Sequence, residues 1–121
     1  AAILAEMGAR VFTIERHIEL LSAARQRLDA LGHQVASKGG DGTIGWRPFA
    51  PYDAILVAAA SPEVPAPLLE QLAPGGRMVI PLGDRAGQTL TLVRREADGL
   101  KVSTIEDVRF VPLLGEFGFS S

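Results

Sequence analysis

The sequence contains no cysteine, and histidine occurs only twice, at His17 and His33. Without cysteine the chain has no disulfide framework, no thiolate zinc site and no cysteine nucleophile. Two histidines are too few for a multi-histidine metal centre, so we expect no bound metal. The sequence also has no serine–histidine–acid set and no phosphate loop of the G-x-x-x-x-G-K type. These absences exclude a cysteine nucleophile and a thiolate zinc site, and they argue against a multi-histidine metal site and a serine–histidine–acid triad.

Strong charge of one sign and long apolar runs are missing as well. Lys and Arg total 12 against 14 Asp and Glu, which gives a net charge of -2. Because nucleic-acid binding needs a basic surface, we expect no nucleic-acid partner. No stretch approaches the roughly 18 apolar residues of a membrane span, and the first residues lack the basic start of a signal peptide. We therefore expect no membrane partner and a cytoplasmic location.

What is present is the composition of one folded domain. The chain has 121 residues, of which 47% are hydrophobic and 21% charged, a balance typical of a globular domain. It starts without Met, and residues 1–7 have the pattern of a helix tail that Gly8 ends. We therefore expect one domain whose first helix is already under way at residue 1.

Strands and helices alternate along the first two thirds of the predicted structure. Apolar spacings of three and seven predict a helix over residues 16–31, and a second helix carries Leu68, Leu69 and Leu72 before it ends at residues 74–76. Apolar runs rich in β-branched residues predict the strands. The predicted strands are 10–14, 33–37, 53–60, 77–82, 89–94 and 100–111.

The last third of the chain has a different pattern, strand–turn–strand. Residues 97–99 (A-D-G) are a hairpin turn signal between two strands that show period-two alternation. Strands alternating with helices indicate a parallel sheet, and a hairpin adds antiparallel strands to it. The sequence therefore predicts an α/β fold with antiparallel C-terminal strands.

Acidic residues follow the first two predicted strands. Ligands of open α/β sheets bind beyond the carboxyl ends of the strands, where Glu15 could accept hydrogen bonds from a ribose diol. Asp41, between Gly40 and Gly42, could accept from an adenine amino group while the glycines let the base approach. The alternatives are a solvated acid at a helix start for Glu15 and a plain Asp-Gly turn for Asp41. Taken together, the two acids favour an adenosine lying across neighbouring strand ends.

Small side chains follow the central predicted strand. Residues 58–62 (A-A-A-S-P) would leave open space at the edge of the sheet, where the reactive end of a cofactor would lie. Close packing of strand against helix explains the same residues equally well.

Several stretches in one order resemble a known enzyme family. These are Glu15, G-D-G at 40–42, P-Y-D-A-I-L-V-A-A-A-S-P-E-V-P from residue 51, L-L-E-Q-L-A-P-G-G-R-M-V-I-P-L-G from residue 68, and V-R-F-V-P-L at 108–113. The L-x-P-G-G-R part is shared by many S-adenosylmethionine-dependent methyltransferases. The A-A-A-S-P-E-V-P and V-R-F-V-P-L stretches are more particular. Together they resemble the protein-L-isoaspartate O-methyltransferases, over nearly the whole chain.

The resemblance implies a Rossmann-like methyltransferase sheet and S-adenosyl-L-methionine as cofactor. It implies methyl transfer to the free carboxyl of L-isoaspartyl residues in damaged proteins, which initiates their repair, by an enzyme that is monomeric when full length. The implied cofactor-binding residues are Glu15, Asp41, Gly42 and Ala58. The implied substrate-binding residues are Ala59, Ala60, Pro62, Val108, Phe110 and Val111.

No catalytic side chain is expected for this reaction. A carboxyl group with an ordinary pKa of about 3.9 is already ionised at neutral pH, so it needs no general base. The cofactor supplies the activated methyl group, and the protein positions the reactants and excludes water. The missing cysteine and catalytic histidine therefore agree with the resemblance.

The family also has parts that the resemblance does not find here. These are a first strand with its glycine-rich loop and an N-terminal helical segment, so we expect residues 1–121 to be a partial methyltransferase domain with an incomplete sheet. Two alternatives stay open: a non-catalytic adenosine-binding remnant, and a small-molecule methyltransferase of the same superfamily. The V-R-F-V-P-L stretch argues against the second alternative.

Overall fold

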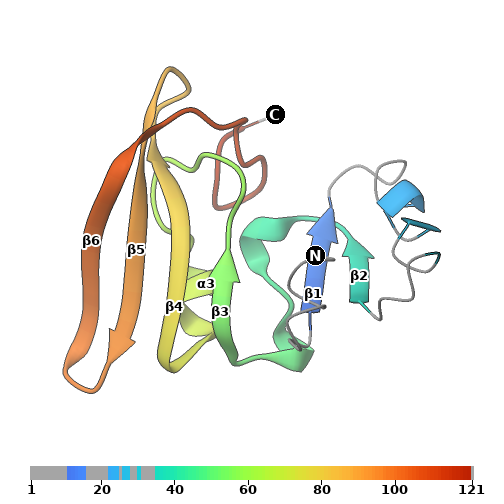
Figure 1. Cartoon of the computed structure of the whole chain (residues 1–121), viewed down its shortest axis with the longest axis horizontal. Coiled ribbons are helices and arrows are strands. Elements are labelled where there is room, and N and C mark those ends of the chain that lie inside the picture. Colours follow the sequence, from blue (N-terminus) through green and yellow to red (C-terminus); the bar gives the residue numbers. More distant parts are fainter. Residues whose placement is uncertain (1–10, 16–21, 25, 28–29, 31–34, 121) are drawn as a thin grey trace. The chain divides into compact units, whose positions relative to one another are not determined.

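The described part of the chain contains two β-sheets. The structure is a computed structural model, and it describes residues 11–15, 22–24, 26–27, 30 and 35–120. The chain divides into two compact units, residues 1–42 and residues 43–121. Each unit carries its own sheet, one of two strands and one of four (Figure 1).

The sheet of the first unit consists of two parallel strands. They are β1 (Val11–Glu15) and β2 (Val35–Gly39), and their last residues lie opposite each other. Parallel strands need a crossover connection, commonly a helix. Residues 22–24, 26–27 and 30 are helical, in agreement with the predicted helix. The rest of that helix and the predicted helix tail at residues 1–7 lie outside the described residues.

The second unit combines a parallel pair of strands with an antiparallel meander. Its sheet has the order β3-β4-β5-β6, in which β3 pairs with β4 in parallel and the other pairs are antiparallel. This arrangement confirms the predicted α/β fold with antiparallel C-terminal strands. The strands are β3 (Tyr52–Leu56), β4 (Leu72–Gly83), β5 (Gln88–Glu96) and β6 (Gly99–Val108), joined by the helix α3 (Ala66–Glu70) between β3 and β4.

The core of the second unit lies between α3 and one face of the sheet. Leu68 of α3 packs into a cluster with Met78 and Ile80 of β4 and Val93 of β5, each at most 5% exposed. Met78 and Val93 are direct partners across β4 and β5, so alternate residues of both strands point into this core. Burial of side chains of this size contributes roughly 1.5–3 kcal/mol each, so this cluster is a main source of the unit's stability.

Helix α3 ends earlier than the sequence predicts. The predicted helix includes Leu72, but α3 stops at Glu70 and Leu72 is the first residue of β4. The reason is a competing backbone pairing: Tyr52 donates its amide hydrogen to the Gln71 carbonyl oxygen at 2.7 Å, and Leu72 lies opposite Tyr52. Sheet pairing with β3 therefore ends the helix before Leu72.

The last strand is also shorter than predicted. Strand β6 ends at Val108, and the following residues leave β5 and pair instead with the chain beyond β3. The isolated bridge Ala60–Pro112 marks this change of partner. The change places the predicted substrate segments side by side.

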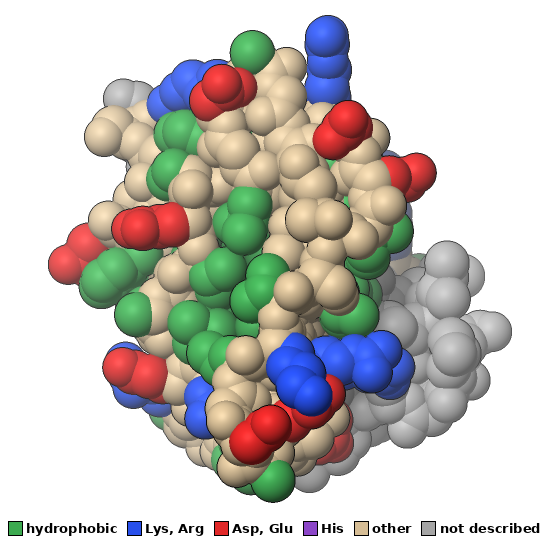
Figure 2. Space-filling view, turned by 90° about the vertical axis from the view of Figure 1, so that its left-hand side faces the viewer, with side chains coloured by type: hydrophobic (Ala, Val, Ile, Leu, Met, Phe, Trp, Pro, Cys, Tyr) green, Lys and Arg blue, Asp and Glu red, His purple; other side chains and the backbone are tan. Residues whose placement is uncertain are grey.

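Strand β6 forms one edge of the four-stranded sheet. Figure 2 looks at this side of the molecule and shows apolar side chains gathered between charged ones. On β6, Leu100, Val102 and Ile105 are 45%, 63% and 55% exposed.

In the part of the chain that the structure describes, every helix is too short or too polar to reach across a bilayer.

Candidate functional site

The first group of predicted site residues lies at the carboxyl ends of β1 and β2. Glu15 ends β1 opposite Gly39, the last residue of β2, and Asp41 and Gly42 follow two and three residues later. Because the two strands are parallel, these residues leave the same edge of the sheet. The structure therefore brings the two strand ends together as predicted, while the Glu15 side chain lies outside the described part.

The loop after β2 offers open space at its glycines. A Cβ atom built on Gly42 would meet nothing within 4 Å, and Asp41 is half-buried. Gly40 has φ +147°, a conformation that side chains rarely adopt. The loop therefore combines a carboxylate with backbone that a flat ring can approach closely.

The second group lies in the segment that continues β3. Ala58 is exposed and Ala59 is half-buried, whereas Ala60 and Ser61 are completely buried. The segment is held to β4 because Ser61 donates to the Pro81 carbonyl at 2.9 Å and accepts from the Gly83 amide at 3.0 Å. Within this segment Ala60 is therefore fully enclosed, whereas Ala58 is open to solvent.

A backbone junction joins this segment to the stretch after β6. The Ala60 amide donates to the Val111 carbonyl oxygen, and the Leu113 amide donates to the Ala60 carbonyl oxygen, both at 2.6 Å. Phe110 and Val111 are 38% and 69% exposed beside this junction. The structure therefore brings predicted substrate residues from two distant stretches together.

The other predicted substrate residues flank this junction. Pro62 is exposed and follows the buried Ser61, and Val108 is half-buried at the end of β6. In the described residues no group of three or more His, Cys, Asp or Glu side chains is arranged to hold a metal ion.

One residue of this region was missed by the sequence analysis. Gln88, the first residue of β5, accepts a hydrogen bond from the Phe110 amide at 2.7 Å. It also lines an open hollow of 670 Å³ together with Asp84, Thr89, Asp107 and Arg109. A polar residue at the start of an alternating strand is common, so the sequence carries no signal for this contact.

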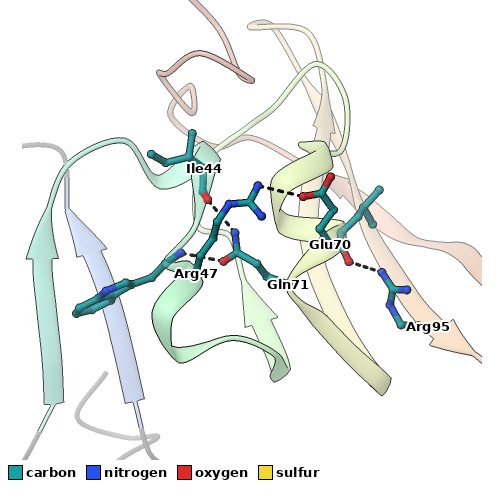
Figure 3. Close-up of polar contacts among 7 residues, drawn as sticks. Ile44, Arg47, Glu70, Gln71 and Arg95 are labelled. Atoms are coloured by element: carbon teal, nitrogen blue, oxygen red, sulfur yellow. Dashed lines mark hydrogen bonds and ion pairs between the residues drawn. The ribbon is translucent and has the colours of Figure 1, made fainter.

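A second glutamine fixes the loop between the two 3-10 turns Gly42–Ile44 and Arg47–Phe49. The Gln71 side chain donates to the Ile44 carbonyl and accepts from the Trp46 amide, both at 2.9 Å (Figure 3). Figure 3 also shows the ion pair between Arg47 and Glu70, at 3.0 Å, which joins the same loop to α3. The loop is therefore attached to α3 by buried and exposed contacts.

Tyr52 completes this attachment. Its hydroxyl donates to the Trp46 carbonyl at 2.6 Å, and burial raises the pKa of the phenol above its ordinary value. The Tyr52 side chain thus holds the loop to the start of β3, while the Gln71 side chain holds it to the end of α3.

Comparisons with known proteins identify the family of this chain. The family model described as protein-L-isoaspartate(D-aspartate) O-methyltransferase matches residues 1–118. A protein-L-isoaspartate O-methyltransferase from Salinibacter ruber is 54% identical over 127 residues, which cover 96% of this chain and 55% of the relative. Protein-L-isoaspartate O-methyltransferase 1 from Syntrophobacter fumaroxidans is 49% identical over 120 residues, 98% of this chain and 56% of the relative.

Solved structures agree with this family. A protein-L-isoaspartate O-methyltransferase is similar with a TM-score of 0.82 and 28% identity, over 90% of this chain and 35% of that one. A structure described as a beta-aspartate methyltransferase from Plasmodium falciparum in complex with S-adenosyl-L-homocysteine has a TM-score of 0.76 at 22% identity, over 93% and 56% of the two chains. At that identity the second likeness supports the Rossmann-like fold alone. The chain spans about half the length of the curated relatives it matches, and it belongs to the protein-L-isoaspartate(D-aspartate) O-methyltransferase family.

Proposed function

We propose that the chain forms part of an enzyme that methylates the free carboxyl group of L-isoaspartyl residues in damaged proteins. The methyl donor in this proposal is S-adenosyl-L-methionine. Family membership supports the activity. The observation that carries it is the junction between Ala60 and Val111, which joins the two stretches predicted to bind substrate.

The residues predicted to hold the cofactor fit its chemistry. The Asp41 carboxylate can accept from an adenine amino group, and the open space at Gly42 leaves room for the ring. Glu15 ends the neighbouring strand, where a carboxylate can accept from a ribose diol. The exposed, small Ala58 leaves space at the end of the second sheet. When bound, S-adenosylmethionine supplies a methyl group activated by a sulfonium.

In this reaction the chain binds and positions the substrate. A carboxylate oxygen of the isoaspartyl residue forms the new O–C bond while the S–C bond breaks, and S-adenosylhomocysteine leaves. No proton has to be removed, because the carboxylate is already ionised at neutral pH. The exposed Phe110 and Val111 offer apolar contact to a peptide and exclude water beside the reacting carboxylate.

Methyl transfer to paired peptides tests the activity. The protein for this experiment is the Salinibacter fusion, in which this chain replaces the matching segment of the Salinibacter ruber relative. We expect it to methylate an isoaspartyl peptide and not the same peptide with ordinary aspartate. Methylation of both peptides, or of neither, would contradict the proposal.

A control separates this activity from adenosine binding without catalysis. The chain alone, titrated with S-adenosylhomocysteine in a calorimeter, reports whether its own residues bind the cofactor product. Binding without methylation in the fusion would favour an adenosine-binding protein without catalysis.

The proposal also includes a monomer acting in the cytoplasm, and light scattering behind a size-exclusion column measures the mass of the fusion protein.

A further inference from the structure

Gln88 is a buried side chain that is hydrogen-bonded at both ends of its amide. It is 5% exposed, its Nε2 donates to the Asp84 carbonyl at 2.6 Å, and its Oε1 accepts from the Phe110 amide at 2.7 Å. The two contacts reach in opposite directions along the chain, four residues back and 22 residues forward. One side chain therefore connects the β4–β5 turn to the stretch after β6.

The turn end of this connection is itself fixed. The Asp84 carboxylate accepts from the backbone amides of Ala86 and Gly87, at 2.8 and 3.1 Å. This is an Asx-type turn, which fixes the backbone without help from the rest of the sheet. The Asp84 carbonyl is thus a well-placed acceptor, and the orientation of the Gln88 amide follows from it.

The other end of the connection lies in the predicted substrate stretch. Phe110 and Val111 lie beyond the end of β6, so the ladder with β5 no longer holds them. Two contacts replace it: the Phe110 amide with Gln88 and the Val111 carbonyl with the Ala60 amide. These successive anchors fix the backbone while the two side chains stay 38% and 69% exposed.

We infer that Gln88 is a positioning residue for substrate binding, which it serves by holding the Phe110–Val111 backbone in place for the isoaspartyl peptide. The inference rests on the proposed function, because it assigns the peptide to this stretch. An amide suits the role since it offers a donor and an acceptor on one planar group. Loss of the Phe110 contact would leave a backbone amide unpaired and let the stretch move.

Steady-state kinetics of the Salinibacter fusion test this role. The variant Gln88→Leu keeps much of the side-chain volume and removes both hydrogen bonds. We expect the KM for an isoaspartyl peptide to rise about tenfold, which corresponds to about 1.4 kcal/mol. The KM for S-adenosylmethionine and kcat should stay within about twofold, because the stretch is predicted to contact the peptide alone.

Gln71→Leu is the matched control. Gln71 is also a buried glutamine, 3% exposed, with two backbone hydrogen bonds, but it holds Ile44 and Trp46. It should lower thermal stability as Gln88→Leu does while the peptide KM stays unchanged. An equal rise of the peptide KM in both variants would show a general loosening and overturn the inference.

Gln88→Glu adds a pH readout. A protonated glutamic acid keeps both contacts, because its OH donates to Asp84 and its C=O accepts from Phe110. An ionised glutamate loses the donor, and burial raises the pKa of such a carboxyl group. We expect this variant to have a nearly normal peptide KM at about pH 5.5. Its peptide KM should rise several-fold by about pH 8.5, beyond any change that the unsubstituted fusion shows. If the peptide KM of the variant and that of the unsubstituted fusion change with pH in the same way, the inference is overturned.

Amide hydrogen exchange gives a readout that needs no activity. The Phe110 amide should exchange slowly in the unsubstituted protein, because its hydrogen bond to Gln88 protects it. Gln88→Leu should accelerate exchange at Phe110 by a larger factor than at core amides such as Val93, whose exchange follows only the global stability. Fast exchange at Phe110 in the unsubstituted protein would overturn the inference even if the proposed activity is found. Absent methylation with a protected Phe110 would count against the proposed function instead.

Discussion

The side chain of Gln71 lies directly against the backbone of Gly45. A Cβ atom built on Gly45 would fall 2.2 Å from Gln71 Oε1, and Gly45 has φ +69°. Gln71 cannot easily turn aside, since its amide is hydrogen-bonded to Ile44 and Trp46 on both sides of this glycine. Glycine is therefore required here both by the backbone conformation and by the space.

Replacement of this glycine should destabilise the second unit strongly. We expect Gly45→Ala to lower the free energy of unfolding by about 3 kcal/mol, from backbone strain together with the broken Gln71 contacts. Gly87→Ala is the control, because its Cβ would meet nothing within 4 Å and its φ is not in the left-handed region. Urea unfolding of both variants measures the difference, and equal losses would contradict the role given to Gln71.

The alternation of apolar residues predicted the strands well where both neighbours are strands. Residues 89–94 read as a strand, and β5 is Gln88–Glu96. Period two arises from side chains that face opposite sides of a sheet, so local sequence suffices to detect it. The element order of the second unit was accessible for this reason.

The boundaries that failed depend on partners far along the chain. Leu72 has helical spacing with Leu68 and Leu69, yet it starts β4 because Tyr52 pairs with this part of the chain. Residues 109–111 leave the β5 ladder because Ala60 offers a new partner. Non-local hydrogen bonds override local spacing in both cases, and no window of sequence contains them.

The candidate site shows the same limit. Motif resemblance named Ala60 and Val111 as neighbours of one substrate, and the structure pairs them. The side chains of Gln88 and Gln71 each make a hydrogen bond to distant backbone, 22 and 25 residues away. Such contacts leave no periodicity and no motif, so only the structure reveals them.

Ionisation of Tyr52 should lower stability at alkaline pH. Burial raises the pKa of its phenol in the folded chain, so folding favours the protonated form. This stabilisation is complete below the ordinary pKa of about 10 and is lost as pH rises through the folded-state value. Tyr52→Phe removes the titration, so the difference in unfolding free energy between the two proteins should shrink above about pH 10.

At neutral pH the same variant should cost about 1 kcal/mol, because the hydrogen bond to the Trp46 carbonyl is lost. Thermal or urea unfolding across the alkaline range measures both effects. A difference between the two proteins that does not change with pH would show that Tyr52 has no raised pKa.

The exposed edge of β6 should promote self-association. Ile105 is 55% exposed on this edge strand, close to a register shift in its pairing with β5. Apolar edge strands associate readily, and a lysine on such a strand opposes further pairing. We expect Ile105→Lys to reduce concentration-dependent light scattering of the chain. Ser103→Lys adds the same charge without removing apolar surface, and an equal reduction there would assign the effect to net charge.

The two Asp-Gly pairs of the chain allow a direct test of the cofactor site. Asp41–Gly42 follows β2, whereas Asp98 lies in the turn between β5 and β6 and Gly99 is the first residue of β6. We expect Asp41→Ala to weaken binding of S-adenosylhomocysteine about tenfold in the Salinibacter fusion, since one hydrogen bond to a charged acceptor is lost.

Asp98→Ala removes the same charge from a plain turn, so it should leave that affinity unchanged. Calorimetric titration of both variants supplies the comparison. If both lose affinity equally, the effect comes from overall charge, and if neither does, Asp41 only shapes a turn. A loss confined to Asp41 would separate recognition of the cofactor from turn formation, which the same two residue types serve at both places.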